Sequence, residues 1–166
     1  MDGSGGASLS AVADDPDVVS VERLIASPPE PIFELLANPD RHRDIDGSGT
    51  VQGAKGQAAR LALGSSFGMS MRMGVPYSMV STVVEYEENR RLAWQTRGPG
   101  PLGRFVGGRI WRYELEPAEG GTLVRESWDI SQESPFTKPL VKRAAASATR
   151  RNMAATLERI EKLVTG

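Results

Sequence analysis

The chain ends in one long helical pattern that follows a series of strand patterns, and this order limits the fold more than any other feature. From residue 138 to 164 the large side chains on one face recur with a helical period; they are Thr149, Met153, Leu157, Ile160 and Val164. A helix of about 27 residues extends roughly 40 Å, so it needs a long partner surface. Its N-terminal half offers only small residues, among them Ala145, which either let the helix lie close to a sheet or leave a void beneath it.

The region before this helix predicts consecutive antiparallel strands. Alternating apolar and polar residues, bounded by Gly, Pro or Asn, indicate strands at residues 18–26, 59–63, 67–73, 77–86, 91–97, 104–116 and 122–130, with a weak strand at 50–52. Short turns at residues 88–89 and 117–121 predict hairpins. A proline-started helix at 29–37 and a helical turn at 40–44 interrupt the series after the first strand. The pattern therefore predicts an α+β fold with two short helices after strand 1.

Composition limits the domain organisation and the chemistry. The 166 residues, of which 39% are hydrophobic and 25% charged, suit one domain at 18–166, preceded by a disordered tail at 1–17. The chain has no cysteine and a single histidine, so a thiolate site or a multi-histidine metal centre is not expected, and we predict no metal and no cofactor.

Charge and hydropathy limit the partners. The net charge of −1 gives no global field toward nucleic acid or an anionic membrane. No stretch approaches the roughly 20 apolar residues of a membrane span, and the N-terminus lacks a signal-peptide pattern. We therefore expect a cytoplasmic protein, a monomer or homodimer, without nucleic-acid binding or integral membrane association.

A row of methionines is the most unusual local feature. Phe67, Met69, Met71 and Met73 alternate with small or charged residues, so they share one face of a strand. Methionine is flexible and polarizable, and a row of it suits the wall of a binding cavity. The same row is also compatible with an ordinary apolar core.

Four segments resemble the START-like SRPBCC superfamily, and within it bacterial polyketide cyclase/dehydrase-type proteins. They are IASPPEPIF at 25–33, LANPDRH at 36–42, WRYELEP at 111–117 and GGTLVRESWD at 120–129. The resemblance covers about residues 18–165. It implies a helix-grip fold, in which a curved antiparallel sheet of about six or seven strands wraps around the long C-terminal helix. It also implies an elongated apolar cavity whose mouth is bordered by the short helices.

The inward-facing positions of this fold supply the candidate ligand-binding residues. They are Phe67, Met69, Met71, Met73, Leu92, Trp94, Trp111, Tyr113, Glu126, Trp128, Ala145, Thr149 and Met153. A hairpin that pairs Leu115 with Val124 sets Tyr113 opposite Glu126 and Trp111 opposite Trp128. This register turns the carboxylate of Glu126 inward.

An inward Glu126 needs a partner, because burying a lone carboxylate costs several kcal/mol. Tyr113 and Arg109 are the candidates. The three residues are catalytic candidates that could move a proton, or they could orient a ligand's oxygen, or they could form a structural polar pair. A bulge could also turn Glu126 to solvent. His42 lies among charged residues and is expected at the surface.

Three functions remain open. The first is binding of a hydrophobic or aromatic molecule, such as a lipid, polyketide or isoprenoid, for transfer, storage or presentation. The second is an aromatase/cyclase or dehydratase that acts in the same cavity, where folding the substrate supplies most of the catalysis. The third is a protein-interaction module, which a closed and well-packed interior would favour.

Overall fold

The computed structural model describes residues 15–54 and 59–166, without the side chains of residues 144–146. Seven strands form one sheet, and one long helix ends the chain. The strands are β1 (Val18–Ile25), β2 (Val51–Ala54), β3 (Ser66–Met73), β4 (Val75–Glu87), β5 (Arg91–Arg97), β6 (Gly107–Ala118) and β7 (Gly121–Asp129). The helices are α1 (Pro29–Ala37), η1 (Pro39–Arg41), α2 (His42–Ile45), η2 (Gly100–Arg104) and α3 (Lys138–Thr165).

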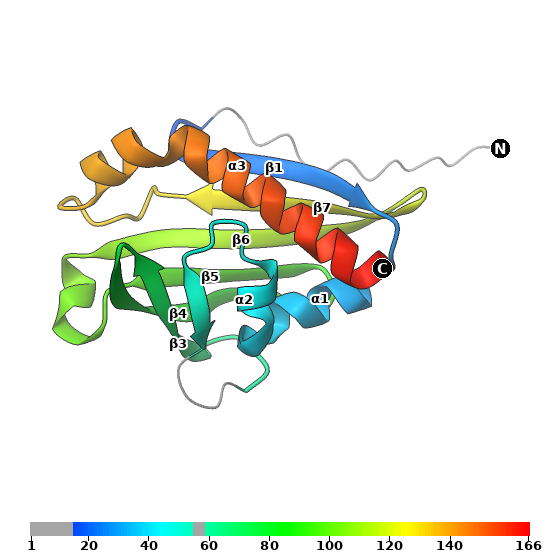
Figure 1. Cartoon of the computed structure of the whole chain (residues 1–166), viewed down its shortest axis with the longest axis horizontal. Coiled ribbons are helices and arrows are strands. Elements are labelled where there is room, and N and C mark those ends of the chain that lie inside the picture. Colours follow the sequence, from blue (N-terminus) through cyan, green and yellow to red (C-terminus); the bar gives the residue numbers. More distant parts are fainter. Residues whose placement is uncertain (1–14, 55–58) are drawn as a thin grey trace.

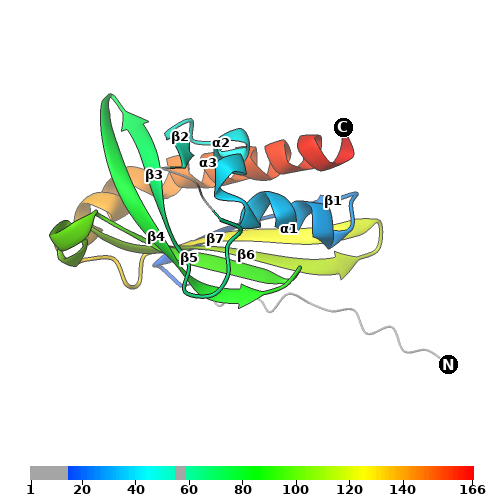
Figure 2. The ribbon, with the colours of Figure 1, turned by 90° about the horizontal axis from the view of Figure 1, so that it is seen from below.

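The sheet is antiparallel throughout, and its order β1-β7-β6-β5-β4-β3-β2 confirms the predicted meander. Only β1 is out of sequence order, because it pairs with the last strand. The sheet curls around α3, which runs along β1 and β7 (Figure 1). Figure 2 shows α1, α2 and α3 on the same face of the sheet. This arrangement is the helix-grip fold that the family resemblance implied.

A proline, a capping side chain and a glycine determine where the short helices begin and how they pack. Pro29 lies at the first position of α1, where a missing N–H costs nothing, and Asn38 caps η1 through a hydrogen bond from the Asp40 N–H to its side-chain oxygen (3.1 Å). After α2, Gly47 passes so close to α3 that a Cβ would lie 2.1 Å from the carbonyl oxygen of Asn152. The Gly47 N–H donates to Thr156 Oγ1 at 3.0 Å. Glycine at this position therefore lets the loop after α2 pack directly on α3.

The buried apolar residues divide into two groups. The larger group joins α1, α2 and the C-terminal half of α3 to the middle of the sheet, and it includes Phe33, Leu36, Trp94, Leu115 and Ile160. The smaller group consists of Trp128, Ile130 and Met153. Partly buried Val21 and Trp111 pack against both groups.

One predicted strand is absent, and the start of another is wrong. Residues 59–63 form no strand; instead Leu61 is buried and its N–H donates to the Ala37 carbonyl at 2.8 Å, which ties this segment to the end of α1. The strand expected from residue 104 begins at Gly107, because residues 100–104 form the 3-10 helix η2. Most of the predicted tail, residues 1–14, lies outside the described part of the chain.

Candidate functional site

The inner face of the sheet brings the aromatic candidates into contact. Trp94 lies opposite Trp111, and Trp111 lies opposite Trp128, so all three share one face. The predicted register of the last hairpin is confirmed: Leu115 pairs with Val124 and Tyr113 with Glu126. Because neither strand has a bulge in this stretch, Glu126 points toward the interior.

One aromatic cluster fills the part of the interior next to α2. The Trp94 ring stacks on His42 with centroids 4.9 Å apart, and Phe67 meets both rings edge-on at 5.5–5.8 Å. The Tyr113 ring follows at 5.5 Å from Trp94. Phe67, Trp94, Tyr113 and the neighbouring Leu92 are buried. These side chains therefore fill the space next to α2 themselves, where a ligand cavity was expected.

His42 is buried, so the expectation of a surface histidine is wrong. Its Nε2 lies 2.7 Å from the Leu36 carbonyl oxygen and donates to it in the neutral tautomer with a protonated Nε2. Burial lowers the pKa of His42 to about 4, although the Leu36 carbonyl and the carboxylates of Asp40 and Asp46 favour the charged form. The charged neighbours of His42 do not indicate its position, because a short helix turns His42 and Ile45 inward while Arg43 and Asp44 face solvent.

The exposure of the methionine side chains increases along β3. Met69 is buried, Met71 is partly exposed, and Met73 is 69% exposed at the end of β3. The expectation that Met73 faces the interior is therefore wrong, because the β3–β4 turn extends past the cover that the helices supply. Trp111 is also partly exposed, although it lies on a central strand and packs against the apolar group that includes Met153 of α3. The interior is thus less tightly closed toward the β3–β4 end.

Glu126 lies between the two apolar groups and contacts Tyr113 of the larger group. On β7, Val124 belongs to the larger group and Trp128 to the smaller one, and Glu126 separates them. The Tyr113 hydroxyl donates to Glu126 Oε1 at 2.8 Å, and the other carboxyl oxygen, Oε2, has no hydrogen-bond partner among the described residues. The Glu126 side chain is thus deeply buried with half of its hydrogen-bonding capacity unused.

The burial changes the protonation of this pair. Loss of solvent raises the pKa of Glu126 to about 8; the Tyr113 hydrogen bond acts in the opposite direction, and the carboxylate of Asp46 adds to the rise. Burial and the nearby Glu126 charge also raise the pKa of Tyr113 well above its ordinary value. At neutral pH the pair therefore consists mainly of a neutral phenol and a neutral carboxylic acid.

Arg109 does not join this pair, which corrects the expected cluster. Its guanidinium binds Glu133 through Nε to Oε2 at 3.2 Å and Nη2 to Oε1 at 3.0 Å. The side chain of Glu133 is fully buried and also accepts from Thr137 Oγ1 at 2.7 Å. Next to it, a Cβ on Gly108 would lie 2.1 Å from the Gln132 carbonyl oxygen, so glycine is required for this close approach. No pattern in the sequence pointed to Glu133, which follows the last strand in a polar stretch.

The remaining candidates lie on α3 and β7. Thr149 and Met153 are buried on the face of α3 that covers the sheet, and Trp128 is buried opposite them in the smaller apolar group. The side chain of Ala145 lies outside the described part of the structure. In that part no three metal-ligating side chains come together, and no helix has the length and hydropathy to cross a membrane.

Two open depressions lie outside the region around Glu126. One of about 450 Å³ lies between β4, β5 and η2, and one of about 280 Å³ lies along β2, β3 and β4 beside Met71 and Tyr77. Neither is the elongated enclosed cavity that the resemblance implied. The interior near Glu126 is instead lined by the partly exposed and buried side chains described above.

Comparison with known proteins agrees with this geometry. The family described as polyketide cyclase / dehydrase and lipid transport matches residues 17–165. The uncharacterized protein Rv0088 of Mycobacterium tuberculosis is 35% identical over 123 residues, which cover 73% of this chain and 51% of that protein. The chain thus spans about half the length of the curated relatives it matches.

Solved structures share the fold at low identity. Protein CV1439 from Chromobacterium violaceum has a TM-score of 0.67 at 13% identity, covering 92% of this chain and 99% of its own. The di-domain ARO/CYC StfQ from the steffimycin biosynthetic pathway has a TM-score of 0.67 at 12% identity, covering 90% of this chain and 50% of its own. By fold and by family match, the chain belongs to the polyketide cyclase/dehydrase and lipid transport family.

Proposed function

We propose that the chain binds an apolar small molecule between the inner face of the sheet and α3, with an oxygen of that molecule on Glu126. The buried Oε2 of Glu126, which has no partner among the described residues, carries this proposal. A buried polar atom left without a hydrogen bond costs about 1–3 kcal/mol, so a ligand that supplies the partner recovers this energy on binding. The apolar residues on both sides of Glu126 would hold the rest of the molecule.

The protonation of Glu126 indicates the chemistry of the ligand. Because its pKa is about 8, the carboxyl group is mainly protonated at pH 7 and Oε2 acts as a donor. The matching ligand group is an acceptor, such as the carbonyl or hydroxyl oxygen of a polyketide, an isoprenoid or a lipid. The family description and the ARO/CYC neighbour support this ligand class.

The open half of the interior is the natural entry route for this ligand. Trp111 and Met71 are partly exposed there, and the methionine side chain can change rotamer at low cost. The aromatic cluster around Trp94 would form the closed end against which the molecule stops. We therefore expect Trp111, Trp128, Met71, Thr149 and Met153 to contact the ligand.

A first test asks what the purified protein carries. Native and denaturing mass spectra of one sample should reveal a small molecule that is bound under native conditions and released on unfolding. Its absence would favour a transiently bound substrate over a stored ligand.

A second test measures binding through the three tryptophans, all of which lie on the inner face. The probes are 6-propionyl-2-(dimethylamino)naphthalene and the matched compound without the carbonyl, 2-(dimethylamino)naphthalene. Glu126→Leu should weaken binding of the carbonyl probe about tenfold, the equivalent of one hydrogen bond, and leave the matched compound unchanged. Glu126→Gln keeps a donor and should retain affinity for both. If Glu126→Leu bound the carbonyl probe as tightly as the parent protein does, the role assigned to Glu126 would be refuted.

The protonated state of Glu126 also favours a second function, that of a cyclase or dehydratase. A carboxylic acid with a pKa near 8 can donate a proton to a substrate carbonyl at neutral pH, and the adjacent Tyr113 hydroxyl would hold the resulting carboxylate. In this case Glu126→Gln abolishes turnover of a poly-β-ketone while probe affinity stays the same. If Glu126→Gln kept both probe binding and turnover, the pair of Glu126 and Tyr113 would have a structural role only.

A further inference from the structure

Four large apolar side chains are exposed together at one end of the molecule. Leu102 in η2 is 56% exposed, Phe105 just after it 51%, Phe136 before α3 73% and Leu140 in the first turns of α3 71%. The rings of Phe105 and Phe136 meet edge-on with centroids 5.5 Å apart, which joins the two segments. Figures 1 and 2 both place η2 and the start of α3 at the same end. We call these four residues the apolar end patch.

The chain around the apolar end patch is strongly basic. Residues 97–109 and 131–143 contain six basic residues and one acidic residue, whereas the whole chain has a net charge of −1. The one acidic residue, Glu133, is buried and neutralised by Arg109. Asp17 approaches from the start of β1 and pairs with Lys138 and Lys142 at 2.8 and 3.3 Å.

Several of these cations have no carboxylate partner. Among the described residues, Arg104 and Arg143 form no ion pair, and Arg97 donates to the Gly103 carbonyl oxygen at 3.2 Å. Arg97 and Arg104 are also the charged residues that line the depression of about 450 Å³ beneath η2. The basic end therefore offers exposed cations beside exposed apolar side chains.

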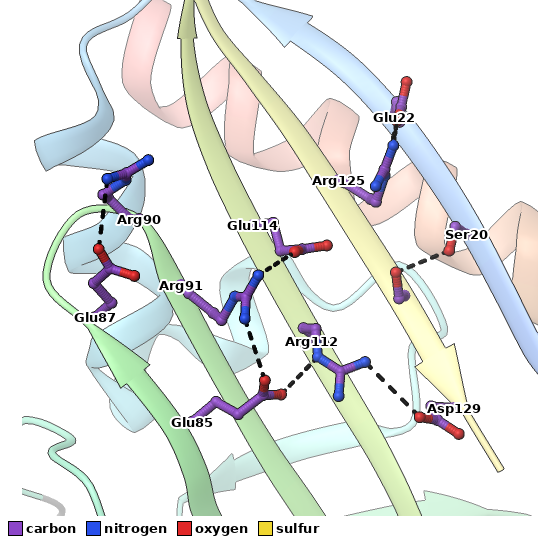
Figure 3. Close-up of polar contacts among 11 residues, drawn as sticks. Ser20, Glu22, Glu85, Glu87, Arg90, Arg91, Arg112, Glu114, Arg125 and Asp129 are labelled. Atoms are coloured by element: carbon purple, nitrogen blue, oxygen red, sulfur yellow. Dashed lines mark hydrogen bonds and ion pairs between the residues drawn. The ribbon is translucent and has the colours of Figure 1, made fainter. Parts of the chain in front are cut away.

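The outer face of the sheet shows the opposite behaviour. Its charges alternate in sign and pair with one another, as Arg91 does with Glu114 and Arg112 with Glu85 (Figure 3). Such a face presents little net charge to a partner. The unbalanced positive charge is thus a local property of the end that carries the apolar end patch.

We propose that the apolar end patch and its basic surround bind the surface of an anionic lipid bilayer. The apolar side chains would enter the boundary between headgroups and acyl chains, while Arg97, Arg104 and Arg143 would face lipid phosphates. A symmetric contact with a second copy fits less well, because it would bring these cations against the same cations of the partner. The near-neutral total charge, from which we expected no attraction to an anionic membrane, conceals this asymmetry.

The position of this surface connects it with the interior. Figures 1 and 2 place the β3–β4 turn, where Met73 and Val75 are exposed, at the same end as η2 and the start of α3. A molecule leaving the bilayer would therefore meet the less closed half of the interior. The membrane-binding proposal itself does not depend on the proposed function, because it concerns surface residues outside the ligand-binding set.

Co-sedimentation with vesicles tests the proposal on the full chain. We expect binding to phosphatidylcholine vesicles that contain phosphatidylglycerol, binding at least about tenfold weaker to pure phosphatidylcholine, and a loss of binding at high salt. The double variants Phe136→Ser/Leu140→Ser and Arg104→Glu/Arg143→Glu should each lower the bound fraction about tenfold or more. Because all four side chains are exposed, the variants should keep the circular dichroism spectrum of the parent.

Matched controls lie on other surfaces. Leu63→Ser removes an apolar side chain that is 66% exposed, and Arg90→Glu reverses an exposed charge in the β4–β5 turn. Neither should change vesicle binding. Equal binding to both vesicle types, or equal binding by the patch variants, would overturn the proposal. A dimer that dissociates in Phe136→Ser/Leu140→Ser, without vesicle binding by the parent, would assign the patch to a second copy.

Discussion

Two buried glutamates, Glu133 and Glu126, differ in how completely their carboxyl groups are hydrogen-bonded. Glu133, in the connection from β7 to α3, accepts two hydrogen bonds from Arg109 and one from Thr137. Glu126, in the middle of β7, accepts one from Tyr113 and leaves Oε2 without a partner in the described structure. They are only seven positions apart in the sequence and have the same residue type, so the difference comes from their surroundings.

The carboxylate of Glu133 has a structural role, whereas that of Glu126 is suited to binding or proton transfer. Glu133 lies in the connection between β7 and α3, and its carboxylate is paired with the guanidinium of Arg109 on β6. Glu126 is fixed by strand pairing to β1 and β6 on both sides, and its neighbours on the inner face are apolar or aromatic. Burial then favours its protonated form, which leaves a hydrogen-bond donor inside the molecule.

The largest expected effect comes from removing the partner of the satisfied glutamate. Arg109→Met leaves the fully buried Glu133 with Thr137 alone, and we expect the free energy of unfolding to fall by about 3–5 kcal/mol at pH 7. Urea denaturation followed by tryptophan fluorescence measures this change. The double variant Arg109→Met/Glu133→Leu should recover most of the loss, because no unpaired charge remains. A loss below about 1 kcal/mol in the single variant would show that the pair contributes little.

Replacing Glu126, which lacks a partner for Oε2 in the described structure, should raise the free energy of unfolding instead of lowering it. The pKa of Glu126 is raised from 4.5 to about 8, so the folded state binds one more proton than the unfolded state between these pH values. Stability should therefore fall as pH rises from about 4.5 to 8 and stay low above it. Glu126→Gln removes this loss and should be more stable than the parent by roughly 2–4 kcal/mol at pH 9, with a small difference at pH 4.5.

The measurement for Glu126→Gln is the difference between two urea denaturation series over pH. His42 adds a separate slope to both proteins: because its pKa is lowered to about 4, stability is lost as pH falls below 6.5. Subtraction of the two series removes this contribution. A difference that does not depend on pH would mean that Glu126 is ionised in the folded protein, and the contrast with Glu133 would disappear.

The contrast also shows what the sequence could predict. Strand alternation and turn residues were enough for the meander, and they gave the pairing of Tyr113 with Glu126 that turns the carboxylate inward. Hairpin register depends on a short turn and an unbroken alternation, both of which are local in the sequence. The long C-terminal helix was predicted for the same reason.

Contacts between distant segments were harder to predict. Arg109 pairs with Glu133 because the loop after β7 folds back on β6, and no periodic pattern indicates this return. His42 is buried because a four-residue helix turns one side chain inward among charged neighbours. Met73 is exposed because strand alternation gives the face but not the extent of the cover above it.

A smaller effect is expected from the hydroxyl that Glu126 does use. Tyr113→Phe keeps the ring that packs on Trp94 and removes one hydrogen bond, so the free energy of unfolding should fall by about 1 kcal/mol. Because this hydrogen bond favours the ionised carboxylate, the pKa of Glu126 should rise further above 8. Carbon-detected NMR titration of the Glu126 carboxyl group measures the pKa directly. A lower pKa in Tyr113→Phe would show that water replaces the hydroxyl and that the site is less closed than the structure indicates.

The smallest effect is expected where carboxylates are paired at the surface of the same sheet. Arg91 lies 2.8 Å from Glu114 and 3.6 Å from Glu85, but its side chain is 46% exposed, so solvent screens both pairs (Figure 3). Arg91→Met should lower the free energy of unfolding by less than about 1 kcal/mol, and about 1 M salt should reduce this loss further, because mobile ions screen exposed charges. Arg90→Met is the matched control, since its pair with Glu87 at 3.6 Å is still more exposed and should contribute almost nothing. If Arg91→Met instead matched Arg109→Met, then exposure would not decide what a paired carboxylate contributes, and the loop around Glu133 would lose its special structural role.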